Sequence, residues 1–117
     1  MKDEDMLFEN LVSELRRGTL ILSVLALLRQ PQYGYSLVSG LEARGVPIEA
    51  GTLYPLLRRL EKQGLLSSEW DVDQTRPRRY YVLNAAGTVI LSRLADEWQK
   101  MTSVIEVLIG ETKPDNH

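Results

Sequence analysis

The chain has 117 residues, enough for one domain with a modest hydrophobic core. It contains no cysteine, which excludes disulfides, a thiol nucleophile and a zinc–thiolate site. The longest apolar run, residues 20–28, is far shorter than the roughly 20 residues that cross a membrane, and the acidic N-terminus has the wrong sign for a signal peptide. These features predict a cytoplasmic protein.

Charge is unevenly distributed along the chain. The net charge is -2, yet residues 51–83 contain six basic and four acidic residues. The first fourteen residues carry one basic and five acidic residues, and the segment from Asp96 onward carries two and five. The pattern is consistent with one cationic face between two acidic ends, and such a face suits a polyanionic partner.

Two helices are expected in the first 45 residues. Residues 7–28 form the first, whose second half is apolar nearly all round and therefore predicts a central buried helix that ends at Gln30-Pro31-Gln32. Residues 33–45 form the second, with an inward face at positions 37, 38 and 41 and Gly45 at its end. Residues 46–50 connect it to the next helix.

Residues 51–66 predict a short helix with two faces. One face is a leucine stripe at three- and four-residue steps, at positions 53, 56, 57 and 60. Thr52 is expected to be the N-cap, Pro55 to lie in the first turn and Gly64 to close the helix. The opposite face is polar and basic, with Thr52, Pro55, Arg58, Arg59 and Lys62.

Two short helices joined by a short link, the second one basic, predict a helix-turn-helix whose second helix enters the DNA major groove. In that reading Arg58 binds guanine or phosphate, and Lys62 binds phosphate. The alternative is an ordinary solvated face on which Glu61 pairs with a neighbouring basic residue. Arg59 either joins the DNA contacts or turns toward the strands that follow.

Residues 65–83 predict two strands and a polar turn, which is a β-hairpin. Its tip carries Arg76, and Arg78 and Arg79 open the return strand, so the hairpin completes a winged helix with a basic wing. Tyr80 and Tyr81 point to opposite sides of the strand, and one of them is expected in the core. Trp70 is expected to serve packing.

Asn84 is the expected cap of a last helix over residues 86–109. Its apolar residues repeat at alternating steps of three and four for nearly three heptads. A helix this long buries only part of the stripe on its own core, so we expect it to pair with a second chain. The expected dimer interface consists of Leu91, Leu94, Trp98, Met101, Ile105 and Leu108, with Leu7, Phe8, Leu11 and Leu15 as the companion surface.

The stretches Gly51-Thr52-Leu53-Tyr54-Pro55-Leu56-Leu57-Arg58-Arg59-Leu60-Glu61-Lys62-Gln63-Gly64-Leu65 and Arg78-Arg79-Tyr80-Tyr81-Val82-Leu83-Asn84-Ala85-Ala86-Gly87, preceded by Tyr33-Gly34-Tyr35-Ser36-Leu37, resemble the PadR family of bacterial transcriptional regulators. The resemblance covers nearly the whole chain. With its single C-terminal helix, the chain is similar to the small subgroup that includes a lactococcal multidrug-sensing repressor. It implies a winged-helix homodimer that binds pseudo-palindromic operators, usually represses transcription, and is released by a small aromatic or phenolic effector.

The resemblance also implies roles for individual residues. The positions that match the family's DNA contacts are Thr52, Tyr54, Pro55, Arg58 and Lys62 in the recognition helix, Arg76 and Arg78 in the wing, and Tyr33 and Ser36 in the preceding helix. Tyr54 either contacts DNA or supports the start of the recognition helix. Trp98 matches a tryptophan that sandwiches flat ligands across a central pore, with Leu15 and Met101 as expected neighbours; the alternative is a tryptophan that fills the interface.

The expected architecture is mainly α with a small β-hairpin. Residues 1–85 form the winged helix-turn-helix domain with its N-terminal helix, 86–110 the dimerisation helix and 111–117 a frayed tail. The single histidine, His117, lies in that tail, and neither a phosphate loop nor a metal-binding constellation is recognisable, so neither an enzyme nor a cofactor is expected. The alternative to a DNA-binding regulator is a winged-helix protein-interaction module without specific DNA binding.

Overall fold

The structure, a computed structural model, describes residues 2–73 and 75–111. In chain order its elements are α1 (Lys2–Leu27), β1 (Gln32–Tyr33), α2 (Gly34–Ala43), α3 (Ala50–Lys62), β2 (Leu66–Asp71), β3 (Arg78–Leu83) and α4 (Ala85–Glu111). The predicted mainly helical fold with a hairpin is confirmed, although α1 begins five residues before the expected start at Leu7. Of the predicted frayed tail, Glu111 ends α4 and residues 112–117 lie outside the described residues.

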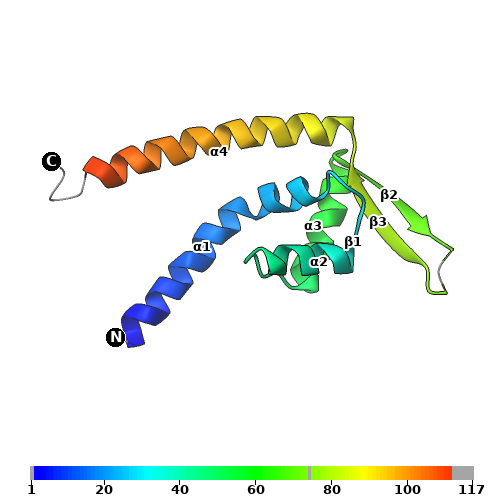
Figure 1. The fold of residues 1–117 in the computed structure, drawn as a ribbon, viewed down its shortest axis with the longest axis horizontal. Coiled ribbons are helices and arrows are strands. Elements are labelled where there is room, and N and C mark those ends of the chain that lie inside the picture. Colours follow the sequence, from blue (N-terminus) through cyan, green and yellow to red (C-terminus); the bar gives the residue numbers. More distant parts are fainter. Residues whose placement is uncertain (1, 74, 112–117) are drawn as a thin grey trace.

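The sheet has three antiparallel strands in the order β1-β3-β2 (Figure 1). The hairpin strands β2 and β3 pair from Leu66 opposite Leu83 to Asp71 opposite Arg78. Strand β1 was not predicted: Tyr33, expected in the second helix, instead pairs with Tyr80. The physical reason is Pro31, which ends α1 and favours extended backbone around it, so that the chain crosses the edge of β3 before α2 begins.

Leucines from every helix meet in one core. The predicted inward residues of α3 are confirmed, with Leu53, Leu57 and Leu60 fully buried and Leu56 9% exposed. The second half of α1, predicted to be a central buried helix, is confirmed in part: Val24 and Leu25 are fully buried, whereas its apolar residues Leu20, Ile21, Leu22 and Leu27 are partly buried. The core therefore fixes α3 by one face and leaves its other face on the surface.

The helix ends follow the predicted chemistry in two places. Gly64 has a φ of 84° and closes α3, and the Leu65 N–H donates to the Leu60 carbonyl at 3.1 Å. At the start of α4, the Asn84 side-chain oxygen accepts a hydrogen bond from the Gly87 N–H at 2.9 Å, so Asn84 is the cap. The Asn84 amide group also donates to the Gly64 carbonyl at 2.9 Å, which ties the start of α4 to the end of α3.

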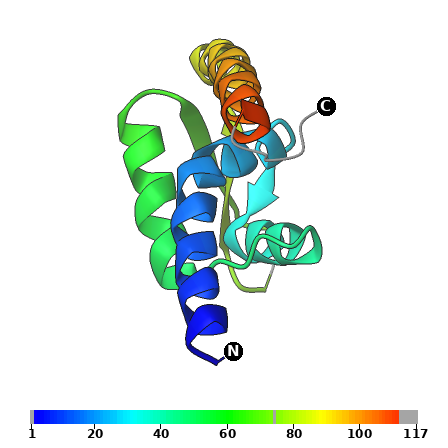
Figure 2. The ribbon, with the colours of Figure 1, turned by 90° about the vertical axis from the view of Figure 1, so that its left-hand side faces the viewer.

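Two helices project from the core. Figures 1 and 2 show the N-terminal half of α1 and the C-terminal half of α4 extending away from the sheet. The radius of gyration is 17.8 Å, whereas a compact domain of this length has about 13 Å. Of the 27 residues of α4 only Gly87 and Leu91 are buried, so most of this helix packs against nothing in its own chain.

Candidate nucleic-acid interface

The outward face of α3 carries the two predicted cationic residues. Arg58 and Lys62 are exposed and lie one turn apart, opposite the buried leucines. Neither forms an ion pair within residues 2–73 and 75–111. Their charges are therefore available to a partner that approaches this face.

Two details of α3 differ from the prediction. The helix begins at Ala50 with Glu49 as the N-cap residue, and the N–H groups of Thr52 and Leu53 both donate to the Glu49 carbonyl at 3.0 Å. Thr52 is thus a first-turn residue and not the cap. Pro55 consequently lies in the second turn, where it removes the donor that the carbonyl of Gly51 would otherwise receive.

Thr52 and Arg59 lie on the side of α3 that faces α1. Both line a hollow whose other wall includes Arg17 and Leu20 of α1. Glu61 lies on the opposite side of α3, where its carboxylate meets the wing. Arg59 therefore turns toward α1, and the expectation that it could turn toward the wing is wrong.

Tyr54 supports the join between α3 and α2. A methyl group added at Gly34, the first residue of α2, would fall on the Tyr54 ring and hydroxyl, so the ring rests directly on the Gly34 backbone. The side chain is nevertheless 39% exposed. A larger residue at position 34 would have to displace the Tyr54 ring, so Tyr54 serves packing whatever else its exposed part contacts.

Ser36 and Tyr33, both predicted to contact DNA, have partners inside the chain. The Ser36 hydroxyl accepts a hydrogen bond from the Tyr33 N–H at 3.0 Å and donates to the Gln32 side-chain oxygen at 2.7 Å. The Tyr33 hydroxyl donates to the Asp71 carboxylate at 2.7 Å, and this hydrogen bond raises the pKa of Tyr33. Ser36 therefore ties the start of α2 to β1, and Tyr33 ties it to the wing.

The three arginines of the wing lie in two different environments. Arg76 and Arg78 are exposed, and the Arg78 guanidinium lies over the Tyr33 ring, 4.0 Å from the ring centroid. Arg79 points to the other side of the strand, and its guanidinium donates to the Glu61 carboxylate at 2.8 Å. The Ser68 hydroxyl completes this group, since it donates to Glu61 and accepts from Arg79.

The group of Glu61, Ser68 and Arg79 joins α3 to the wing. This group was not predicted, although the sequence contained one signal for it. Adjacent residues of a strand point to opposite sides, so only one of Arg78 and Arg79 can lie on the outer surface of the wing. The two tyrosines that follow obey the same alternation. Tyr81 is buried, whereas the Tyr80 hydroxyl donates to Glu69 at 2.8 Å, as the prediction of one core tyrosine requires.

Trp70 does not pack as expected. Its side chain is 60% exposed near the end of β2, and it lines a hollow whose other walls include Gly34 of α2 and Tyr54 of α3.

The predicted dimer surface is exposed in the single chain, except at Leu91 and Leu94. Leu91 is 5% exposed and belongs to the chain's own core, against which Leu94 is partly buried. These two positions therefore belong to the domain, and the free stripe of α4 begins at Trp98. The other predicted residues are exposed: Leu7, Phe8, Leu11 and Leu15 by 54% to 71%, and Trp98, Met101, Ile105 and Leu108 by 42% to 58%.

Within the described residues, no group of three or more histidine, cysteine, aspartate or glutamate side chains is arranged to hold a metal ion. In the same range, none of the helices has the length and apolar character needed to span a membrane.

Comparison with known proteins identifies the family. The profile of the transcriptional regulator PadR-like family matches residues 21–93, which include α2, α3 and the whole wing. The chain belongs to the PadR-like family. The crystal structure of a PadR family transcriptional regulator from Eggerthella lenta is 46% identical and matches with a TM-score of 0.91 over 97% of this chain and 100% of the other.

Two further relatives connect the family to transcription. A transcriptional regulator of Mycobacterium tuberculosis is 43% identical over 60 residues, which cover 51% of this chain and 56% of the relative. The Bacillus subtilis PadR protein, whose structure contains operator DNA, is 22% identical and matches with a TM-score of 0.60 over 66% of this chain and 45% of the other, so it shares the fold. By family, this PadR-like chain is thus a transcriptional regulator.

Proposed function

We propose that this PadR-like protein is a cytoplasmic homodimer that reads a pseudo-palindromic operator and represses transcription. The observation that carries the proposal is the outward face of α3, where Arg58 and Lys62 are exposed and have no ion-pair partner in the described part of the chain. One arginine can recognise guanine through two parallel hydrogen bonds, and a lysine one turn away can contact a phosphate.

The wing extends this interface. Arg78 is held over the Tyr33 ring and Arg76 lies beyond it in the exposed turn, so both can contact the backbone that flanks the major groove. The group of Glu61, Ser68 and Arg79, called the brace below, holds the wing at one angle to α3. Helix and wing therefore meet DNA as one rigid unit, and less conformational entropy is lost on binding.

The dimer places two such units on one duplex. The exposed apolar residues of α1 and α4 supply the area that a partner would bury, and a two-fold axis would make the interface self-complementary. Half-sites about one helical turn apart, roughly 34 Å, follow from this symmetry. Any ligand that prefers one angle between the paired α4 helices would alter operator affinity.

A small aromatic effector fits the same interface. Trp98 is 42% exposed in the single chain, and symmetry would bring a second indole ring from the partner. Two parallel aromatic planes, with Leu15 and Met101 beside them, would hold a flat ligand by stacking. Neither a cofactor nor a metal enters this proposal.

The test is a titration of the protein into a fluorescent duplex from its own upstream region and into a scrambled duplex, at two salt concentrations. A specific operator should bind about 10³-fold more tightly than the scrambled duplex, and affinity should fall steeply with salt because phosphate contacts release counterions. Equal, weak binding to both duplexes, with no sequence preference in a wider set of genomic fragments, would contradict the proposal and favour a protein-interaction module. Light scattering measures the dimer separately, and a reporter gene distinguishes repression from activation.

Matched variants make the test residue-specific. Arg58→Ala should cost about 1–3 kcal/mol of operator binding and relax sequence preference. Lys62→Ala should weaken all duplexes alike and reduce the salt slope by about 1. Arg44→Ala is the control, since Arg44 is an exposed arginine near the end of α2 that donates to the Gly40 carbonyl. An Arg44→Ala protein that loses as much affinity as Arg58→Ala would show that general charge, not the α3 face, controls binding.

A further inference from the structure

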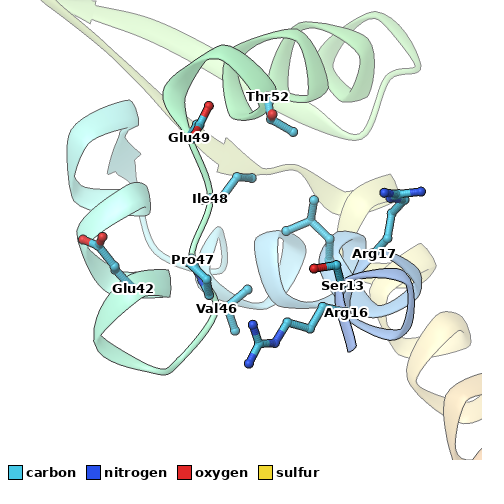
Figure 3. A pocket seen from close by; sticks show the side chains of 10 residues that line it. Ser13, Arg16, Arg17, Glu42, Val46, Pro47, Ile48, Glu49 and Thr52 are labelled. Carbon is cyan, nitrogen blue, oxygen red and sulfur yellow. The ribbon is translucent and has the colours of Figure 1, made fainter. Parts of the chain in front are cut away.

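A groove of about 770 Å³ lies between α1, residues 46–49 and the first turn of α3 (Figure 3). α1 contributes Ser13, Arg16, Arg17 and Leu20 to its wall. A second hollow of about 420 Å³ shares Arg17, Leu20 and Thr52 with the first and continues between α1 and α3 as far as Arg59. The two form one continuous groove along the inner side of α1.

The groove combines an apolar floor with cationic edges. Leu20, Val46 and Ile48 are partly buried and supply branched aliphatic surface. Arg16 and Arg17 form no ion pair within the described part of the chain. Figure 3 shows Arg16 reaching toward Val46 and Arg17 rising on the side of α3.

The acidic residues at the rim do not neutralise these arginines. Glu42 and Glu49 both line the groove, but Figure 3 shows their carboxylates directed away from its centre. The Ser13 hydroxyl, in contrast, points into the space. An apolar body with one carboxylate would thus meet aliphatic carbon on the floor and hydrogen-bond donors at the edge.

The groove and the proposed dimer surface lie on opposite faces of α1. At about 3.6 residues per turn, positions 13, 16, 17 and 20 share one face of a helix, whereas positions 7, 8, 11 and 15 lie on the other. The four residues of the second set are exposed and apolar, so pairing with another chain through them would leave the groove accessible.

We propose that this groove binds a small organic anion, a carboxylate with a compact aliphatic body, and that the bound anion regulates DNA binding. The regulatory part rests on the proposed function. The ligand would touch α1, the connector and Thr52 at once, so it would favour one position of α3 relative to the dimer helix α1. Operator affinity changes to the extent that the two positions differ in affinity for the anion.

The test uses cyclohexanecarboxylate as the probe and cyclohexanecarboxamide as its uncharged match. Backbone amide resonances of the full chain are followed by NMR without DNA. We expect saturable shifts centred on residues 46–52 with the carboxylate and much weaker ones with the amide. Arg17→Gln, and independently Arg16→Gln, should weaken carboxylate binding about tenfold, whereas the exposed-surface variant Arg44→Gln should stay within about twofold of the wild type.

Three results would overturn the proposal. The first is an absence of saturable shifts in residues 46–52. The second is a carboxylate affinity unchanged by both groove variants, or shifts confined to α4, since either places the ligand elsewhere. The third is an Arg17→Gln protein that, without the probe, loses as much operator affinity as Arg58→Ala, because Arg17 would then serve the DNA backbone. The NMR titration contains no DNA, so the two proposals are tested independently. If the protein fails to bind an operator, the proposed function is refuted, and the NMR titration still decides whether the groove binds the anion.

Discussion

Replacing Gly87 by alanine tests how α4 is joined to the rest of the winged-helix fold. A Cβ at position 87 would lie 2.2 Å from the Leu65 carbonyl oxygen and 2.9 Å from Leu83 Cδ2. The Leu65 carbonyl is not free to move, because it accepts the Asn84 N–H at 3.1 Å. The added methyl group must therefore push α4 away from the turn between α3 and β2.

The expected loss of stability follows from three contributions. Overpacking costs about 1–3 kcal/mol, and a weakened backbone hydrogen bond adds about 1 kcal/mol. Alanine regains about 1 kcal/mol, since it is the better helix former. The net loss is about 1–3 kcal/mol, and each kcal/mol lowers the melting temperature of a domain of this size by about 4–8 °C.

Thermal unfolding followed by circular dichroism, at one protein concentration, measures this loss. The control is Gly51→Ala, because an added Cβ at Gly51 in the first turn of α3 meets nothing within 4 Å. We expect this variant to unfold at or slightly above the wild-type temperature. A Gly87→Ala protein as stable as Gly51→Ala would refute the claim that close contact at Gly87 sets the position of α4.

Three further results are expected. Glu61→Gln and Arg79→Gln should each destabilise the fold by about 1 kcal/mol or less, since the pair is partly exposed, and a double-mutant cycle should show that the losses are not additive; additive losses would mean that the brace is absent. The hydrogen bond from Tyr33 to Asp71 raises the pKa of Tyr33, so its contribution to stability is complete below the unfolded value of about 10 and is lost as pH rises through the folded value. An ultraviolet titration of tyrosinate should accordingly show one group titrating at lower pH in Asp71→Asn, and an unchanged curve would contradict this. Ile105→Asp should convert the proposed dimer into a monomer, as measured by light scattering. The circular dichroism of the chain should remain helical, because Ile105 is 50% exposed and contributes nothing to the core.

The sequence predicted those parts of the fold that depend on local pattern. The leucines of α3 are buried at a helical period, and the alternation of Tyr80 and Tyr81 identified one core residue, because both patterns follow from backbone geometry alone. The sequence could not show that Tyr54 rests on Gly34 or that Arg79 reaches Glu61. Both contacts join residues at least eighteen positions apart, and only the packing of α2, α3 and the wing brings them together.

Periodicity also could not separate two kinds of burial. Leu91 and Ile105 lie on one heptad stripe, yet Leu91 is 5% exposed and Ile105 is 50% exposed in the single chain. A heptad repeat reports that one face of a helix is apolar, and it does not report whether that face meets its own domain or a partner. The length of α4 relative to the domain was the informative feature, since only its first three turns pack against the core.

The acidic total charge is compatible with a DNA-binding face because the charges are separated in space. Asp3, Glu4 and Asp5 open α1, and Figure 1 shows this end of the helix on the far side of the molecule from the β2–β3 hairpin. The longest dimension of the chain is 61 Å, several times the Debye length of about 8 Å at physiological ionic strength. Charges on opposite sides of a molecule of this size are largely screened from each other, so the local basic excess and not the net charge governs the encounter with DNA. The acidic end would instead oppose contact between α1 and a neighbouring duplex, which limits non-specific binding to the face that carries α3 and the wing.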